Sequence, residues 1–231
     1  MDMDYSALAR RIDHTEFRTT ATYCDIRRLC LEADHYGFRA VVIQPIHCSR
    51  AAQYLRGSDV AIVAVVGFPT GAFTIAGKGF EARDAIEQGA TEIEFVVNVG
   101  ALRGGHGDLV LEEMRALRQA TGRHILRAIV ETCALSDADK RTVCELGVEA
   151  GIDGLVTSTG YASGEATIED VRLMKRIVGN AFAVKVFQRT CDLHGASERM
   201  DAGATLLGTE SGVQMAETAA LTVSDRQQEQ P

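Results

Sequence analysis

Short runs of apolar and β-branched residues recur along the chain and alternate with longer segments whose apolar residues have helical spacing. A run of the first kind predicts a buried strand, and a segment of the second kind predicts an amphipathic helix. Strands that alternate with helices form parallel sheets through right-handed crossovers. The pattern therefore predicts an α/β protein. The expected strands are residues 9–13, 39–44, 60–68, 92–99, 124–131, 154–158, 182–187 and 205–209.

The segments between these strands carry further helix signals. In residues 106–119, we expect Leu109, Met114 and Leu117 on one side of a helix. Glycines in the sequences EQGA, EAGI and DAGA follow three of the helical segments, a position where glycine commonly ends a helix. Each of these glycines lies just before a predicted strand, which supports the alternation.

The strand–helix units have near-equal spacing, and no linker or second composition regime interrupts them. We therefore expect a single (β/α)8 barrel domain over residues 1–223, with a doubly wound open sheet as the alternative. Only the ends depart from the pattern. Residues 1–8 are expected to form a short helix that covers the barrel bottom, and the polar residues 224–231 a disordered tail.

Composition narrows the class of protein. A length of 231 residues fits one large domain. The net charge of −8 argues against a general nucleic-acid surface. No apolar run approaches the roughly 20 residues that span a bilayer, and we recognise no secretory leader. Six cysteines without a CxxC pair are typical of reduced thiols, which predicts a cytoplasmic protein. The net charge and the lack of a long apolar run predict that it has no nucleic-acid or membrane partner. His14 and His47 have no metal-ligand spacing, so no metal is expected.

The period of two in strands predicts which side chains face the barrel interior. It places charged residues there: Asp13, Glu94, Arg127 and Lys185. Charges in such an interior are costly unless they are paired or used in chemistry. Lys185 has no carboxylate on its own segment, and burial generally favours the neutral, nucleophilic form of an amine. The alternative is a structural ion cluster that plugs the barrel.

Residues 153–164, DGLVTSTGYASG, end a predicted strand in a turn rich in hydroxyl groups and glycine. Because the chemistry of a (β/α)8 barrel lies where its strands end, such a turn is a candidate substrate site. The residue before the hydroxyl groups is Val156, whose side chain can neither attack, donate nor accept. A reactive side chain is thus missing at the place where an enzyme of this fold would use one.

Seven motifs, in this order along the chain, together resemble the deoxyribose-phosphate aldolase family. The resemblance runs from about residue 9 to 213 and implies a (β/α)8 barrel that makes and breaks a carbon–carbon bond through a lysine Schiff base. It also implies acetaldehyde and glyceraldehyde 3-phosphate as partners, no metal or organic cofactor, and assembly as a homodimer. The motifs are IDHT (12–15), VVGFPTGA (65–72), VVNVGALRGG (96–105), IVET (129–132), LVTSTG (155–160), AVK (183–185) and LLGTESG (206–212).

Carried over residue by residue, the resemblance is partial at the catalytic positions. Asp13 and Thr15 match the family's first-strand acid and hydroxyl, and Lys185 matches the second lysine, which assists proton transfer. Glu94 stands where the family has an aspartate of a proton relay, and Arg127 replaces a further lysine. The family's Schiff-base lysine, in a motif like LKTSTG, corresponds to Val156.

The phosphate-binding positions that the resemblance implies are also altered. Gln188 and Arg189 replace a Gly-Gly pair, and Glu210 replaces a serine beside Ser211. A carboxylate about 4 Å from a phosphate costs about 4 kcal/mol per unit charge at a semi-buried site. We therefore expect a small, non-phosphorylated substrate. Two alternatives remain for Arg189. It binds a carboxylate of that substrate through two hydrogen bonds, or it pairs with Glu210 and closes the site.

Three hypotheses follow. The first is a divergent aldolase-like lyase in which Lys185 supplies the Schiff-base amine. The second is a non-imine enzyme of enolisation or cyclisation, with Lys185 or Glu94 as acid or base. The third is a non-catalytic binder or regulator on the same scaffold. Lys185, Glu94 and Asp13 are the expected catalytic residues. The expected substrate-binding residues are Thr15, Asn98, Arg127, Thr157, Ser158, Gly160, Arg189, Glu210 and Ser211.

Overall fold

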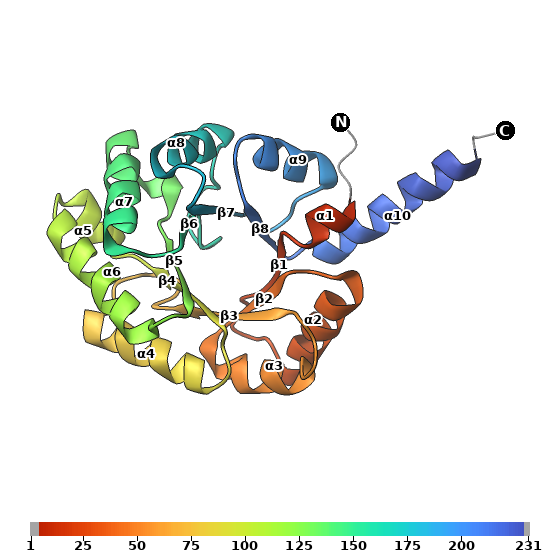
Figure 1. The fold of residues 1–231 in the computed structure, drawn as a ribbon, viewed down its shortest axis with the longest axis horizontal. Coiled ribbons are helices and arrows are strands. Elements are labelled where there is room, and N and C mark those ends of the chain that lie inside the picture. Colours follow the sequence, from red (N-terminus) through yellow and green to blue (C-terminus); the bar gives the residue numbers. More distant parts are fainter. Residues whose placement is uncertain (1–4, 229–231) are drawn as a thin grey trace.

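The strands close into a parallel barrel in the computed structural model, which describes the backbone of residues 5–228 and the side chains of residues 5–221. Each strand pairs with the next in sequence and β8 pairs with β1, which excludes the open sheet (Figure 1). The predicted (β/α)8 fold is confirmed. The strands are β1 Ile12–Glu16, β2 Ala40–Ile43, β3 Ala61–Val66, β4 Glu92–Val96, β5 Ile125–Ile129, β6 Gly154–Val156, β7 Ala183–Phe187 and β8 Leu206–Thr209.

Helices surround the barrel in Figure 1, following the strands around the ring. Three of them, α2, α7 and α8, begin at a capping box in which a Thr or Ser hydroxyl and an Asp carboxylate satisfy the first free amides. The helices are α1 Tyr5–Ala9, α2 Tyr23–Tyr36, α3 Cys48–Tyr54, α4 Ile75–Glu87, α5 Val99–Arg103, α6 Gly107–Thr121, α7 Asp137–Ala150, α8 Ile168–Val178, α9 Leu193–Asp201 and α10 Gly212–Gln228, with short 3₁₀ turns at Pro45–His47 and Thr132–Ala134.

The expected first strand was placed three residues too early. Only Ile12 and the residue after it belong to both the expected and the observed strand. Residues 9–11 instead end α1 and turn into β1, with the Arg11 amide donating to the Leu8 carbonyl at 2.7 Å. The run ARRID has strand-like alternation, but Leu8 and Ala9 are buried at the end of a helix. Tertiary packing therefore set this boundary.

Two further expectations at the helices need correction. Leu109 is 39% exposed, while Met114 and Leu117 are fully buried together with Val110, so the buried face of α6 is rotated by one residue at its start. Helix α10 continues to Gln228, so the expected disordered tail is helical over 224–228, and residues 229–231 lie outside the described residues. Helix α1 lies beside α10, and residues 1–4 of the expected N-terminal helix are also outside the described residues.

The core has two parts, because strand residues alternate between the helices and the barrel interior. In β4, Ile93 and Phe95 pack in the outer core against the helices, while Glu92, Glu94 and Val96 face the interior. The interior apolar cluster lies beside the charged residues and between them and the mouth. Its buried members are Phe17, Ala40, Val42, Val63, Val65, Val96, Ile129, Val156 and Phe187.

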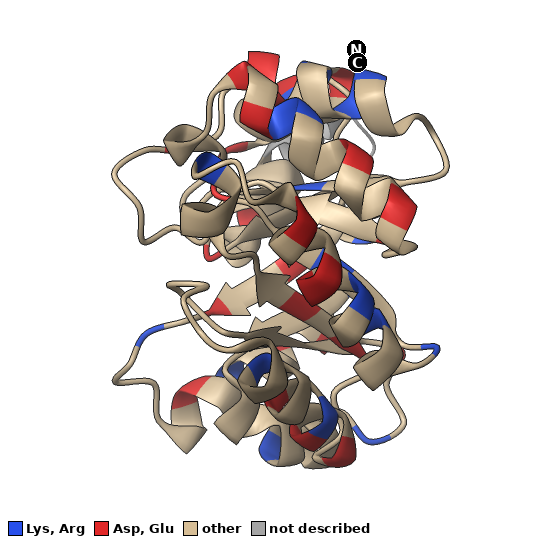
Figure 2. Ribbon diagram, turned by 90° about the vertical axis from the view of Figure 1, so that its left-hand side faces the viewer, with Lys and Arg blue, Asp and Glu red and all other residues tan. Residues whose placement is uncertain are grey.

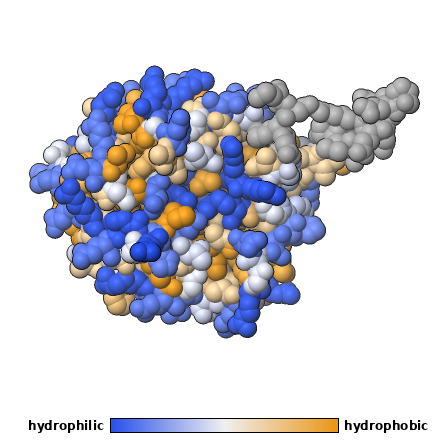
Figure 3. Space-filling view, viewed as in Figure 1, coloured by the Kyte–Doolittle hydropathy of each residue, from blue (hydrophilic) through white to orange (hydrophobic). Residues whose placement is uncertain are grey.

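The surface carries charges of both signs. On the side seen in Figure 2, acidic and basic residues are interspersed over the helices and do not form one basic face. Figure 3 shows hydrophilic residues intermixed with smaller hydrophobic areas. Within the described range, no helix combines the length and the apolar character needed to cross a bilayer.

Candidate active site

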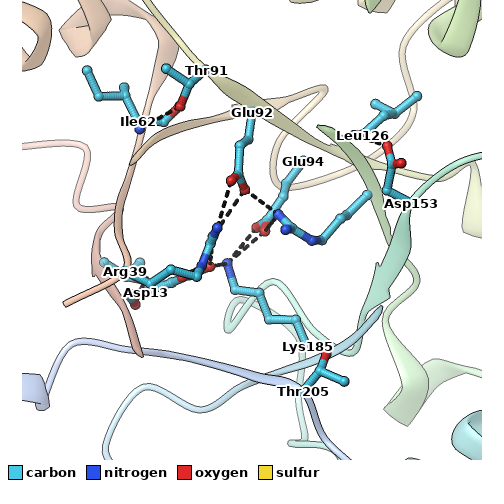
Figure 4. Close-up of polar contacts among 12 residues, drawn as sticks. Asp13, Arg39, Ile62, Thr91, Glu92, Glu94, Leu126, Asp153, Lys185 and Thr205 are labelled. Carbon is cyan, nitrogen blue, oxygen red and sulfur yellow. Dashed lines mark hydrogen bonds and ion pairs between the residues drawn. The ribbon is translucent and has the colours of Figure 1, made fainter. Parts of the chain in front are cut away.

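Six charged side chains form a closed ring of alternating sign inside the barrel, which we call the charge ring (Figure 4). Each cation in it contacts two anions, and each anion contacts two cations. Three positive and three negative charges therefore compensate one another away from solvent. In order, the members are Asp13, Lys185, Glu94, Arg127, Glu92 and Arg39.

Lys185 is held between two carboxylates. Its Nζ atom lies 2.7 Å from Asp13 Oδ2, and 2.7 and 3.0 Å from the two carboxylate oxygens of Glu94. The residue is 1% exposed. Lys185 also pairs in register with Val156 on the adjacent strand, so the amine comes from the same level of the barrel as position 156. The structure thus brings together all three residues that were expected to be catalytic.

Arg39 and Glu92 complete the ring, and neither was expected there. The Arg39 guanidinium donates to Asp13 at 2.6 and 2.8 Å and to Glu92 at 2.6 and 3.1 Å. Arg127 Nη1 lies 2.6 Å from Glu92 and 3.6 Å from Glu94. A signal for Glu92 was available, because it lies two residues before Glu94 and shares its face of the strand. Arg39 immediately precedes β2, and its reach across the barrel bottom depends on the closed geometry.

The ring keeps the carboxylates of Asp13 and Glu92 ionised. Burial opposes ionisation of Asp13, but the charges of Lys185 and Arg39 outweigh it and hold its pKa well below the usual range. The same balance holds for Glu92. Burial raises the pKa of its carboxyl group, but the hydrogen bonds and charges of Arg39 and Arg127 outweigh burial, so the pKa is lowered. Burial alone would lower the pKa of Arg39, yet its two carboxylate partners raise it. All three groups therefore carry their charge at neutral pH.

Apolar side chains cover the charge ring on the side of the mouth. The next interior residues along β4, β5 and β7 are Val96, Ile129 and Phe187, all buried. Phe17, which directly follows β1, contacts Phe187 with ring centroids 5.6 Å apart. A Cβ atom on Gly160 would lie 2.4 Å from the Phe187 ring, so this glycine is what allows the ring to occupy the mouth. A ligand reaches Lys185 only if this layer moves.

A second ion pair lies at the mouth. Arg189 pairs with Glu210 and also donates to the Gly160 carbonyl at 3.1 Å. Its guanidinium carbon lies 5.7 Å from the centroid of the Tyr161 ring. Burial raises the pKa of Glu210 more than Arg189 lowers it. The sequence allowed Arg189 either to bind a ligand or to pair with Glu210, and in the structure it pairs with Glu210. The Glu210 carboxylate lies where the resemblance implies a phosphate site.

The remaining expected pocket residues are engaged in holding the strand ends together. Thr15 donates to the Asp13 carbonyl at 3.1 Å, and Asn98 caps α5 by accepting from the Ala101 amide at 2.9 Å. Thr157 accepts from the Phe187 amide at 3.1 Å and from the Ser158 hydroxyl at 3.3 Å. The Ser211 hydroxyl bonds both backbone groups of Cys191. These residues lie near the mouth, but their polar groups already have protein partners. The residues engaged in this way are Thr15, Asn98, Thr157, Ser158 and Ser211.

Potential metal ligands, namely His, Cys, Asp and Glu side chains, occur in the described part of the chain. Among the residues that the structure describes, no cluster of three or more His, Cys, Asp or Glu side chains is arranged to hold a metal ion. His14 is buried in the middle of β1, where its Nε2 lies 2.9 Å from Glu32 and its ring packs on Phe38.

Comparison with known proteins gives a consistent result. The sequence description of DeoC/LacD family aldolases matches residues 2–187. The chain belongs to this aldolase family. It is 44% identical over 210 residues to a deoxyribose-phosphate aldolase of Carboxydothermus hydrogenoformans, covering 89% of this chain and 92% of the relative. It is 42% identical over 207 residues to that of Deinococcus radiodurans, covering 90% of this chain and 94% of the relative.

Solved structures of aldolases agree with this assignment. One aldolase structure superposes with a TM-score of 0.88 at 31% identity, covering 92% of this chain and 96% of the other. The deoxyribose phosphate aldolase of Aeropyrum pernix, described as a unique tetramer, superposes with a TM-score of 0.85 at 26% identity, covering 94% and 92%. The family resemblance drawn from the seven motifs is thereby confirmed, and an aldolase-like lyase is the class of protein that this membership supports.

Proposed function

We propose that this member of the aldolase family is a lyase that cleaves or forms carbon–carbon bonds of a small carbonyl compound, with Lys185 as its amine. The observation that carries the proposal is the contact of Lys185 Nζ with two carboxylates, at the level of position 156 in the barrel. Family membership supplies the reaction class. Since Val156 has no reactive group, Lys185 is the nearest amine that the described strands offer.

The two carboxylates give the amine a route to its neutral form. An ammonium has no lone pair, so Lys185 must first release a proton, and Glu94 Oε1 accepts a hydrogen bond from it at 2.7 Å. The neutral nitrogen then attacks the carbonyl carbon, and the carbonyl oxygen leaves as water when the imine forms. Glu94 returns the proton that this loss of water requires. Asp13 stays ionised beside Arg39 and orients the amine.

The mouth favours a substrate without phosphate. Glu210 places a carboxylate there, and its partner Arg189 is already neutralised by it. A phosphate group would meet the carboxylate's repulsion, which is about 4 kcal/mol per unit charge at 4 Å in a semi-buried site. An uncharged, short aldehyde such as acetaldehyde avoids this cost. The proposal therefore names a small non-phosphorylated carbonyl compound as the substrate class.

A second candidate is a barrel without catalysis at Lys185, used as a binding or regulatory scaffold. The closure of the charge ring favours it, because every charge is compensated and Lys185 is 1% exposed under an apolar layer. In this case the ring stabilises the barrel interior in place of packed apolar residues.

A third candidate function is acid–base catalysis without an imine. It would use the contact between Lys185 and Glu94, with the Lys185 ammonium as proton donor and Glu94 as proton acceptor.

Borohydride trapping separates these functions. The full chain is incubated with acetaldehyde, reduced, digested and examined by mass spectrometry. Lys185→Met is the blank, and the partly exposed Lys175 is the control for non-specific alkylation. An ethyl adduct on Lys185 well above that on Lys175 is the expected result. No adduct with any of a panel of small aldehydes and ketones rejects the imine. Turnover of such a panel that disappears in Lys185→Met without an adduct then identifies acid–base catalysis, and no turnover at all identifies the non-catalytic barrel.

A reconstruction tests the role of position 156. Val156→Lys places an amine in register with Lys185. Acetaldehyde condensation that appears in this variant and exceeds the activity of the unchanged chain supports the assignment of position 156 as the family's nucleophile site. Folding of each variant is checked by circular dichroism, so that a loss of structure is not read as a loss of chemistry.

Compartment and assembly belong to the same proposal. We place the protein in the cytoplasm, supported by the six cysteines, all of which are free thiols in the described part of the chain. We also propose a homodimer, and the tetramer described for the Aeropyrum pernix relative makes self-association a property to measure. Light scattering of the purified chain at several concentrations decides between monomer, dimer and tetramer.

A further inference from the structure

Four aromatic side chains meet at the mouth of the barrel, and we call them the aromatic lid. They come from four strand ends: Phe17 follows β1, Phe68 follows β3, Tyr161 follows β6 and Phe187 ends β7. The ring centroid of Phe17 lies 4.5 Å from that of Phe68 and 5.6 Å from that of Phe187. Tyr161 meets Phe68 edge-on, with 5.5 Å between centroids. The lid therefore joins strand ends on different sides of the barrel.

Tyr161 holds the outer part of the lid. Phe17 and Phe187 are buried, whereas Tyr161 is 47% exposed. Its hydroxyl donates to the Phe17 carbonyl at 2.8 Å, although the two residues are 144 positions apart in sequence. The residue before it, Gly160, packs so closely on Phe187 that a Cβ atom there would overlap the ring. Two consecutive residues thus contact both of the inner aromatic residues.

Residues 160–165, which we call the mouth segment, are attached by side chains and not by a backbone ladder. Residues 161–165 are all exposed and belong to no helix or strand. Within the described range, no amide of the mouth segment donates to a backbone carbonyl. Exposed backbone with few hydrogen bonds is typical of segments that open locally. Three hydrogen bonds attach the segment to neighbouring loops: Tyr161 to Phe17, Arg189 to Gly160, and Gln188 to Glu165.

The loop that carries Phe68 is fixed by comparison. The Gly67 amide donates to a carboxylate of α4 at 2.8 Å, and the Gly71 amide donates to the Gly67 carbonyl at 2.8 Å. A Cβ atom on Gly71 would overlap the Val97 carbonyl, so this loop also packs tightly on the residue after β4. The mouth segment is therefore the part of the lid with the weakest attachment.

Below the lid, buried valine and isoleucine side chains line the interior, among them Val96, Ile129 and Val156. A charged molecule would lose its hydration there without gaining a partner. We propose that the lid is a gate whose latch is Tyr161. The mouth segment moves outward, Phe17 and Phe187 turn into the space it leaves, and a small uncharged carbonyl compound passes inward. The gate follows from the contacts of the lid, and its use in supplying Lys185 with substrate rests on the proposed function.

A thiol placed below the lid measures its opening without any reaction at Lys185. In the full chain with Val156→Cys, the new thiol occupies a position that is 2% exposed. Iodoacetamide alkylates it, and mass spectrometry follows each cysteine separately. Cys24, exposed on α2, gives the rate of a free thiol, and Cys144, buried in α7, gives the rate set by unfolding. The expected rate lies between the two. A rate equal to that of Cys24 means that nothing closes the mouth, and a rate equal to that of Cys144 means that the lid does not open. Either result overturns the proposal.

Variants in the Val156→Cys background identify the latch. Tyr161→Phe removes the bond to the Phe17 carbonyl and is expected to raise the labelling rate about fivefold, the weight of one ordinary hydrogen bond. Tyr161→Ala also removes the ring contacts and is expected to raise it further. The matched control is Tyr23→Phe, an exposed tyrosine whose ring contacts a histidine and an arginine outside the lid. If Tyr161→Ala labels no faster than the control, or if Cys144 labelling rises in parallel, the proposal is wrong.

Iodoacetate tests the selection against charge, because it carries an anionic group in place of the amide. The ratio of iodoacetamide to iodoacetate labelling is expected to be at least tenfold higher at position 156 than at Cys24. Equal ratios contradict an apolar passage.

The borohydride experiment on Lys185 keeps the gate and the proposed function apart. A gated thiol at position 156 without any adduct on Lys185 rejects the proposed function and leaves the gate. An adduct on Lys185 in a chain whose thiol at position 156 is not gated rejects the gate and leaves the proposed function.

Discussion

Replacing Lys185 by methionine removes one cation from the charge ring while preserving most of the side-chain volume. Asp13 then keeps only Arg39 as a partner, and Glu94 keeps only Arg127, whose Nη1 is 3.6 Å away. At 2.7 Å and an effective dielectric constant of about 20, each lost contact is worth about 6 kcal/mol in Coulomb energy alone. Removing the ammonium also removes its own desolvation cost, so the net loss is expected near the 3–5 kcal/mol typical of a broken buried ion pair.

A loss of this size is a large fraction of the roughly 5–15 kcal/mol that stabilises a folded domain. It corresponds to a fall of roughly 6–20 °C in Tm for a chain of this length. Urea denaturation followed by far-UV circular dichroism measures it, since the chain has no tryptophan to serve as a fluorescent reporter. The control is Arg115→Met, which breaks an exposed pair with Glu149 and is expected to cost less than about 1 kcal/mol.

The double variant Lys185→Met/Glu94→Gln decides whether charge balance is the cause. It removes one cation and one anion, so the ring is neutral again. Its loss of stability should be smaller than the sum of the two single losses by about 0.5–3 kcal/mol, the range of coupling between contacting residues. Additive losses, or a loss below about 1 kcal/mol for Lys185→Met alone, would refute the argument that the ring is held together by its alternating charges.

Other predictions follow from burial and capping. The folded-state pKa values of Asp13 and Glu92 are lowered, so their stabilisation is complete above about pH 5 and is lost as the pH falls below about 4, toward the lowered values. Urea midpoints that do not change over this pH range would contradict it. Met114→Ala should cost about 2–5 kcal/mol, whereas Leu109→Ala at its exposed position should cost less than about 1, as measured by chemical denaturation. Thr167→Ala removes the N-cap of α8 and should cost about 1 kcal/mol, and calorimetry that finds no change in Tm would argue against the cap.

The interior charges illustrate how far the sequence reaches. Strand periodicity correctly placed Asp13, Glu94 and Lys185 in one interior, because alternation is a local property of an extended chain. It gave no partner for any of them. Arg39 and Glu92 became neighbours only when β2 and β4 took their places in a closed barrel, and this closure turned separate charges into a balanced ring.

The mouth illustrates the converse. The sequence left two uses of Arg189 open, namely binding a ligand and pairing with Glu210. Which of the two occurs depends on where the loops after β7 and β8 end, and the structure brings the two side chains together. Likewise, Phe187 follows Lys185 by two residues, but its covering of the interior depends on the absence of a Cβ at Gly160, a residue from another loop.

The order of strands and helices, the family and four of the six interior charges were determined by the chain's own pattern, because spacing and motif are local properties of the sequence. Only the tertiary structure decided that Lys185 is enclosed between two carboxylates and beneath aromatic rings. Distance and solvent exclusion arise from segments far apart in sequence, and these two quantities govern whether a buried amine is a reagent or a structural cation.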